Sequence, residues 1–201
     1  RIWWARHLLN RVHVIERVLV QQIDVLETMT PQDFLEFRQR LAPASGFQSV
    51  QFRELEFLSG AKDPAYVERF RGLTEVEKDR LRRRLEEPTL WDAFLRYLSR
   101  EGYPVSKASL HRDVTAAIEP SADIQRVLVD AYRKDPKTAE LCERLVDLDE
   151  GVQEWRYRHV KMVERTIGMK RGTGGSSGAE YLRATVERPP FPDLWEIRSQ
   201  L

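Results

Sequence analysis

A histidine close to a glycine- and serine-rich segment is the first place where this sequence could support chemistry. His159 lies on the apolar face of a long expected helix, and residues 172–178 follow soon after it. A lone imidazole on such a face is either a core histidine bonded to a carbonyl or the single protein ligand of a haem iron. Zinc is disfavoured, because no second His, Cys or carboxylate stands three or four residues away.

The segment 172–178 reads GTGGSSG and contains Thr173. Such a stretch is often a flexible linker, but this one directly follows the helix that carries His159. It is not a Walker phosphate-binding sequence, because no Gly-Lys-Ser/Thr follows. Both disorder and folding over a bound ligand therefore fit the segment.

Arg38 is the second candidate for chemistry. It shares one face of a short expected helix with three apolar residues, Phe34, Phe37 and Leu41. Its guanidinium either extends from the edge of that face into water or forms a planar fork that fits a carboxylate. Ser45 and Gly46, in the turn after the helix, would let the backbone approach whatever Arg38 binds.

The helix that carries His159 is expected to be the longest element and the centre of the fold. Its stripe repeats in steps of four and three: Leu141, Leu145, Leu148, Val152, Trp155, His159, Met162 and Thr166. A helix of about thirty residues spans roughly 45 Å. A second long helix opens the chain, and its predicted buried stripe is Ile2, Trp4, Leu8, Val12, Ile15, Leu19, Ile23 and Leu26. No segment alternates with period two, so we expect an all-α helical bundle.

Shorter helices are expected to fill the rest of the chain. Thr30 followed by Pro31 predicts a helix start, and Thr74 with Glu77 predicts a capping box. Residues 62–72 are interpreted as a polar connector. The basic run at residues 80–84 is interpreted as a solvated face, because acidic residues flank it. His111 is expected at the surface.

Length and composition limit the class of protein. The chain has 201 residues and a net charge of +1, which favours one domain and gives no reason to expect a nucleic-acid or membrane partner. The single cysteine, Cys142, cannot form a disulfide within the chain, so a cytoplasmic protein is expected. No apolar run reaches the ~20 residues of a membrane span.

Two long stretches make the sequence resemble the tryptophan 2,3-dioxygenases. Residues 19–60 read LVQQIDVLETMTPQDFLEFRQRLAPASGFQSVQFRELEFLSG, and residues 155–186 read WRYRHVKMVERTIGMKRGTGGSSGAEYLRATV. The ending PPFPDLWEIRSQL is similar to that of the bacterial members, whereas residues 62–150 match only in helical character. The resemblance implies a tryptophan/indoleamine 2,3-dioxygenase-like fold and one haem dioxygenase domain over residues 1–201. It also implies the family's reaction, in which both atoms of O2 are inserted across the indole C2–C3 bond of L-tryptophan to give N-formyl-L-kynurenine.

The resemblance also implies roles for individual residues. His159 would be the axial ligand of a b-type haem, and Arg38 would bind the tryptophan carboxylate. Phe34 would pack on the substrate, at a position where some relatives carry Tyr, and Thr173 would hydrogen-bond the substrate's ammonium or carboxylate end. The remaining pocket-lining residues would be Leu41, Ser45 and Gly46.

The resemblance departs from the family pattern at the start of the chain. Members place a distal histidine, which contacts the indole N–H, on a helix upstream of anything present here. His7 and His13 do not match its motif, so no catalytic residue is assigned and the domain is expected to be N-terminally incomplete. Members form homotetramers in which N-terminal segments complete neighbouring sites. The alternative function is a non-catalytic haem-binding or helical interaction module.

Overall fold

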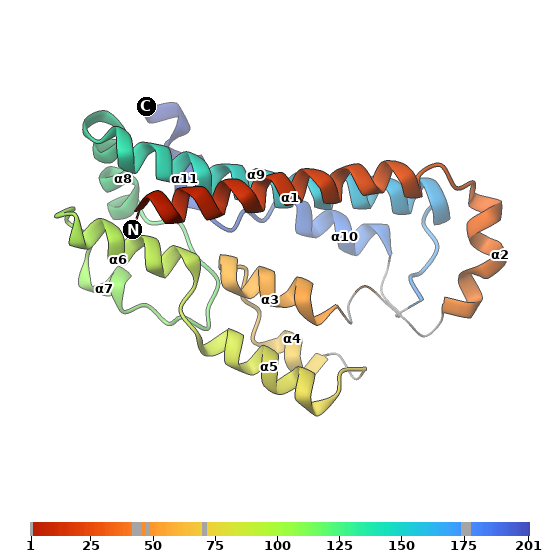
Figure 1. The fold of residues 1–201 in the computed structure, drawn as a ribbon. Coiled ribbons are helices and arrows are strands. Elements are labelled where there is room, and N and C mark those ends of the chain that lie inside the picture. Colours follow the sequence, from red (N-terminus) through yellow and green to blue (C-terminus); the bar gives the residue numbers. More distant parts are fainter. Residues whose placement is uncertain (1, 42–45, 47–48, 70–71, 174–177) are drawn as a thin grey trace. The chain divides into compact units, whose positions relative to one another are not determined.

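The computed structural model describes residues 2–41, 46, 49–69, 72–173 and 178–201 (Figure 1). Within these ranges the regular secondary structure is helical and no strand occurs, which confirms the all-α prediction. None of the helices in these ranges is long and apolar enough to cross a membrane. The chain divides into two compact units, Arg1–Phe47 with Arg144–Pro189, and Gln48–Glu143 with Pro190–Leu201. One of the divisions between them, at Glu143 and Arg144, falls within the longest helix.

The first unit contains the predicted site. Its elements are α1 (Ile2–Leu26), α2 (Pro31–Leu41), the C-terminal part of α9 (Pro136–Ile167) and α10 (Ala179–Val186). Helix α1 lies beside α9 and runs parallel to it (Figure 1): His13 lies within 3.3 Å of the Asp147 carbonyl, and further along both helices Arg158 pairs with Glu27 at 3.1 Å. Two parallel helices therefore form the frame of this unit.

Helix α1 forms as predicted, but most of the stripe predicted to be buried is not: of its eight members only Ile23 is buried, and Ile2 and Val12 are partly buried. Its buried residues are Leu9, Glu16, Val20 and Ile23. The exposed members of the predicted stripe are Trp4, Leu8, Ile15, Leu19 and Leu26. Because apolar side chains occur on more than one face of this helix, periodicity alone does not select the face that packs on α9. One acidic residue, Glu16, lies within the buried face.

Helix α9 is confirmed as the longest element, with 32 residues, and it ends at Ile167, directly before Gly168, whose φ of 59° suits glycine. The first half of its predicted stripe is buried: Leu141, Leu145, Leu148 and Val152. The second half is only partly buried: Trp155, His159, Met162 and Thr166. The stripe is therefore a core face in its first half and a partly open face in its second, where His159 lies.

The second unit has its own core. Its helices are α3 (Val50–Ser59), α4 (Ala65–Arg69), α5 (Glu75–Glu86), α6 (Leu90–Arg100), α7 (Lys107–Leu110), α8 (Ala122–Lys134), the start of α9, and α11 (Pro192–Glu196), with η2 (Ile197–Gln200) after it. One cluster joins α3, α4 and α5 through Val50, Phe57, Tyr66, Val67, Leu73 and Leu81. The predicted capping box of Thr74 and Glu77 is present at the start of α5.

Three expectations for the second unit can be compared with this structure. The interpretation of residues 62–72 as a polar connector is wrong, because α4 lies within them and buries Tyr66 and Val67 in the core. His111 is exposed, as expected. In the basic run, the partly exposed Arg84 and Arg82 pair with Glu54 at 3.0 Å and Glu68 at 3.1 Å.

A buried ion pair between Asp92 and Arg112 stabilises the second unit. The Arg112 guanidinium donates to both carboxylate oxygens of Asp92, at 2.7 and 3.0 Å, and the backbone N–H of Thr89 donates to one of them at 2.7 Å. Burial raises the pKa of Asp92, but the hydrogen bonds from Arg112 and Thr89 outweigh burial, and the pKa lies below its usual value. The ionised carboxylate is therefore the form that the fold stabilises.

Replacing Asp92 by Asn is expected to lower the free energy of unfolding by about 3 kcal/mol, because Arg112 is left without its buried counter-charge. Since folding lowers this pKa, the contribution is present above about pH 4 and is lost as the pH falls through the folded-state pKa. Urea denaturation at pH 7 and at acid pH measures both effects. The half-exposed control Asp130→Asn, which removes a surface pair with Lys134, should change the free energy by less than about 0.5 kcal/mol.

Candidate functional site

His159 lies in the partly open half of α9. Its imidazole stacks on the Trp155 indole one turn earlier, with ring centroids 5.0 Å apart and ring planes 20° apart. Burial lowers the pKa of His159 below its usual value of 6.5, so the ring is neutral at pH 7. A neutral imidazole is the form that donates a nitrogen lone pair to a metal.

The surroundings of His159 fit a haem better than a chelated metal. Within the described ranges, no three His, Cys, Asp or Glu side chains lie close enough together to hold a metal ion. Neither ring nitrogen of His159 forms a hydrogen bond with another described residue, so one nitrogen is available for coordination. Haem iron needs only one such protein ligand on its proximal side.

Helix α2 begins as the sequence predicts. The Thr30 hydroxyl accepts a hydrogen bond from the Asp33 backbone N–H at 3.2 Å, and the Asp33 carboxylate accepts one from the Thr30 backbone N–H at 3.0 Å. These caps orient a helix with no fully buried residue. On its face, the rings of Phe34 and Phe37 meet edge to face at 5.3 Å. A half-exposed aromatic pair of this kind is available to a ligand.

Arg38 links α2 to the segment after α9. Its guanidinium donates a hydrogen bond to the backbone carbonyl of Arg171, 133 residues further along the chain. Thr173, which lies two residues after Arg171, is exposed. The structure therefore brings Arg38 next to the start of the glycine- and serine-rich segment, two features that the sequence alone could not place together.

The ends of that segment lie close to one another. Gly178 has a φ of 71°, and a side-chain carbon added there would lie 2.7 Å from the Lys170 carbonyl oxygen. Glycine is thus required at this position, both for its backbone conformation and for the close approach. The same added carbon would lie 3.7 Å from the Gly172 backbone nitrogen, so the two described ends of the segment, Gly172 and Gly178, are close together.

The other predicted pocket residues are exposed or lie outside the described ranges. Leu41 is 45% exposed, and Gly46 is exposed with open space around it. Ser45 lies outside the described residues. The contacts of the predicted substrate residues include the Phe34–Phe37 ring pair and the hydrogen bond from Arg38, and His159 contacts Trp155 of its own helix.

Sequence reasoning missed three buried charged residues of this unit, Glu16, Asp149 and Arg156. Arg156 is 5% exposed and donates to the backbone carbonyls of Thr185 and Arg188, at 3.0 and 3.2 Å, so it fastens the end of α10 to α9. Glu16 is 7% exposed and faces Gly151 of α9. The available signal was the glycine in the middle of a 32-residue helix, because glycine there usually marks a close approach.

Comparisons with known proteins show the family of this chain. A family profile described as tryptophan 2,3-dioxygenase matches residues 5–110 and 118–201, so the expectation that residues 62–150 match only in helical character is wrong. The chain is 62% identical over 202 residues to a tryptophan 2,3-dioxygenase of Nocardioides sp., covering 100% of this chain and 72% of that protein. It is 55% identical over 197 residues to one of Herpetosiphon aurantiacus, covering 98% of this chain and 75% of that protein. The chain therefore belongs to the tryptophan 2,3-dioxygenase family.

Proposed function

We propose that this protein is a dioxygenase that inserts both atoms of O2 across the indole C2–C3 bond of L-tryptophan, giving N-formyl-L-kynurenine. The observation that carries the proposal is the 62% identity to a tryptophan 2,3-dioxygenase over the whole chain. The product opens the kynurenine route of tryptophan catabolism. The alternative, a non-catalytic haem-binding or helical interaction module, is not favoured by relatives that carry the name of the enzyme.

We propose haem b as the cofactor and His159 as its axial ligand. When bound, the haem iron supplies the chemistry that activates O2. The contribution of the chain is to hold the group and keep the ligating imidazole neutral, and this is supported by the burial of His159 and by its stacking on Trp155.

The proposed substrate site is the surface around Arg38. The planar guanidinium suits the tryptophan carboxylate, and its contact with the Arg171 carbonyl holds it beside Thr173. The Thr173 hydroxyl would bind the polar end of the substrate, and the Phe34 ring would pack on the indole. Leu41, Ser45 and Gly46 would complete the lining. Together these residues orient the zwitterion and exclude water, which are contributions that a protein makes to cofactor chemistry.

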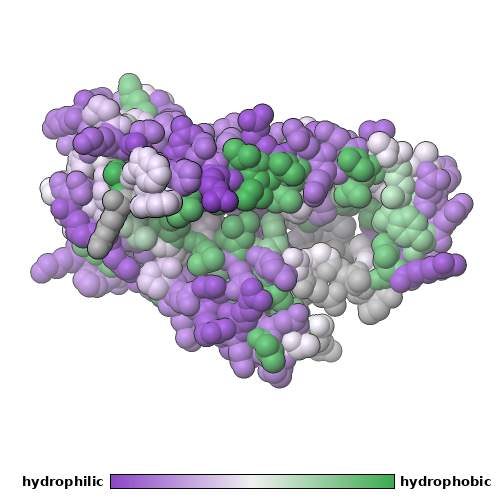
Figure 2. Space-filling model, in the orientation of Figure 1, coloured by the Kyte–Doolittle hydropathy of each residue, from purple (hydrophilic) through white to green (hydrophobic). Residues whose placement is uncertain are grey.

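We also propose that residues 1–201 act as one dioxygenase domain within a cytoplasmic homotetramer in which N-terminal segments complete neighbouring sites. The exposed apolar face of α1 supports an assembly of this kind. Figure 2 shows hydrophobic side chains on the surface of α1. The exposed large apolar and aromatic residues of this helix are Trp3, Trp4, Leu8, Val14, Ile15, Val18, Leu19, Val25 and Leu26. Exposed apolar surface of this extent usually marks an interface.

The deciding experiment is an aerobic turnover assay. The haem-reconstituted protein in its ferrous form is mixed with L-tryptophan, and the absorbance of N-formylkynurenine is recorded together with the haem Soret band. Product formation supports the dioxygenase. A normal Soret band without product would favour the non-catalytic haem-binding module.

A further inference from the structure

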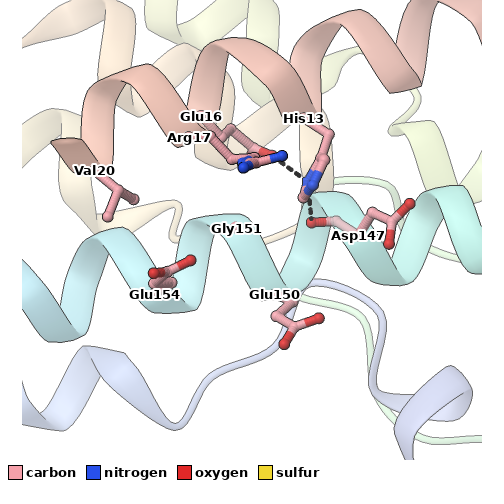
Figure 3. A pocket seen from close by; sticks show the side chains of 8 residues that line it. All are labelled: His13, Glu16, Arg17, Val20, Asp147, Glu150, Gly151 and Glu154. Carbon is pink, nitrogen blue, oxygen red and sulfur yellow. Dashed lines mark hydrogen bonds and ion pairs between the residues drawn. The ribbon is translucent and has the colours of Figure 1, made fainter.

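A pocket of about 290 Å³ lies between α1 and α9, within the first unit (Figure 3). Its lining consists of His13, Glu16, Arg17, Val20, Asp147, Glu150, Gly151 and Glu154. Four of these eight residues are carboxylic acids and only one is a guanidinium. The pocket is therefore strongly acidic, in a protein whose overall net charge is +1.

Glu16 is the most buried acid of this pocket. Its residue is 7% exposed, and neither carboxyl oxygen has a hydrogen-bond partner among the described residues. The closest basic group is the His13 ring, whose Nδ1 lies 3.9 Å from Oε2. A buried carboxylate without a partner is costly, so its presence requires a reason.

Gly151 makes the space that Glu16 occupies. A side-chain carbon added at this position would lie 2.5 Å from Glu16 Oε2 and 3.3 Å from Glu16 Cβ. Glycine in the middle of a helix costs about 1 kcal/mol relative to alanine. Gly151 thus destabilises helix α9, and its lack of a side chain leaves the room that the Glu16 carboxyl occupies.

The charged and titratable groups around Glu16 are mostly acidic. They come from both helices that pack here: His13 and Arg17 on α1, and Asp147, Asp149, Glu150 and Glu154 on α9. One further cation faces this group, Arg144 of α9, which pairs with the Asp147 carboxylate at 2.7 Å and leaves Glu150 and Glu154 without an ion pair to another described residue. Burial, and then the negative charges of Asp147 and Asp149, raise the pKa of Glu16 to about 8. At pH 7 the carboxyl therefore holds a proton, which a positively charged ligand would displace.

The shape of the pocket favours an organic cation over a metal ion. Asp147, Glu150 and Glu154 follow one another at i, i+3 and i+7, which sets a row of carboxylates about 10 Å long along α9. Val20 and Gly151 add apolar surface beside this row. The volume is close to the roughly 300 Å³ at which small-molecule sites begin, and no metal-binding group of three side chains exists in the described part of the chain.

We propose that the pocket between α1 and α9 binds a small organic cation of the alkyl diamine class, with Glu16 as its most buried counter-charge and Asp147, Glu150 and Glu154 along its length. The ammonium groups pair with the carboxylates and the methylene chain lies against Val20 and Gly151. Binding ionises Glu16, so one proton passes to the solvent for each cation bound. Affinity consequently rises with pH up to about 8 and levels off above it, by at most tenfold per pH unit for one proton.

The proposal is tested on the full chain by isothermal titration calorimetry with 1,4-diaminobutane at constant ionic strength. Titrations at pH 6, 7 and 8, in buffers of different ionisation enthalpy, measure the affinity and the number of protons released. We expect binding that tightens with pH and releases close to one proton at pH 7. In Glu16→Gln, which keeps the shape of the side chain, affinity at pH 8 should fall at least tenfold and proton release should disappear. His13→Asn, in contrast, should retain the proton release.

Three controls make the result decisive. Glu119→Gln removes an equal charge from an exposed position of the second unit and should leave binding unchanged. Mg²⁺ at the same ionic strength should not compete, and circular dichroism should show that all variants are folded. The proposal is overturned if the diamine does not bind, if Mg²⁺ displaces it as effectively as a second diamine, or if Glu16→Gln binds it like the wild type.

Discussion

Replacing His159 by alanine is expected to weaken haem binding by more than about a hundredfold, because the iron loses its only protein ligand. The measurement is a titration of the purified protein with haem, followed by the Soret band. His111→Ala is the matched control, since His111 is exposed in the second unit and should bind haem as the wild type does. Added imidazole should restore a Soret band to His159→Ala by filling the space the side chain leaves.

The same titration has a predicted pH dependence. Burial lowers the pKa of His159, so the neutral, ligating form persists below pH 6.5, the usual value for the side chain. Haem affinity should therefore stay constant as the pH falls to about 6.5 and decline only as it passes through the lowered pKa. A Soret band that survives in His159→Ala without imidazole would show that His159 is not the iron ligand.

The fold was predictable wherever a local pattern has one physical solution. The start of α2 follows from Thr30, Pro31 and Asp33, because a cap, a preset φ and a favourable dipole charge all indicate the same position. Helix α9 follows from a stripe sustained over seven steps, and its end follows from Gly168. These features depend on neighbours along the chain, so no knowledge of tertiary contacts was needed.

The parts that sequence reasoning missed depend on contacts between distant segments. The apolar residues of α1 could form more than one buried face, and only packing on α9 selects the face that contains Leu9 and Glu16. Tyr66 and Val67 appeared to belong to a connector because Pro64 and charged residues surround them, although both are core residues. In each case charged or polar neighbours in the sequence made a position look exposed, although tertiary contacts bury it.

The residues of the candidate site could be predicted from the sequence, but their roles could not be derived from spacing alone. His159 and Arg38 could each be singled out from residue type and spacing, but both had a plain structural alternative. Their roles came from the resemblance, and the structure adds the hydrogen bond between Arg38 and the Arg171 carbonyl. That bond joins segments 133 residues apart. Periodicity concerns only neighbours along one helix, so it could not predict this contact. The hydrogen bond also gives Arg38 a structural role, which any mutational test must separate from substrate binding.

Arg38→Ala is expected to raise the KM for L-tryptophan at least about thirtyfold, while the Soret band remains. The scale follows from removing one partner of a desolvated charge pair, which costs about 2–5 kcal/mol. Steady-state kinetics of the haem-loaded protein measure KM and kcat separately. Arg38→Lys keeps the charge but not the planar fork, so its KM should lie between those of Arg38→Ala and the wild type.

A loss of affinity in Arg38→Ala could also arise because the Arg171 segment loosens, and two substrate analogues separate the causes. Tryptamine lacks the carboxylate, whereas indole-3-propionate keeps it and lacks the ammonium group. If Arg38 binds the carboxylate, the variant should lose affinity for indole-3-propionate and bind tryptamine as the wild type does. If its role is only to hold Arg171 in place, both analogues should weaken equally, because both need the same indole pocket. Equal weakening would place Arg38 outside the substrate site. A loss confined to the carboxylate-bearing analogue would show that the guanidinium binds the substrate carboxylate.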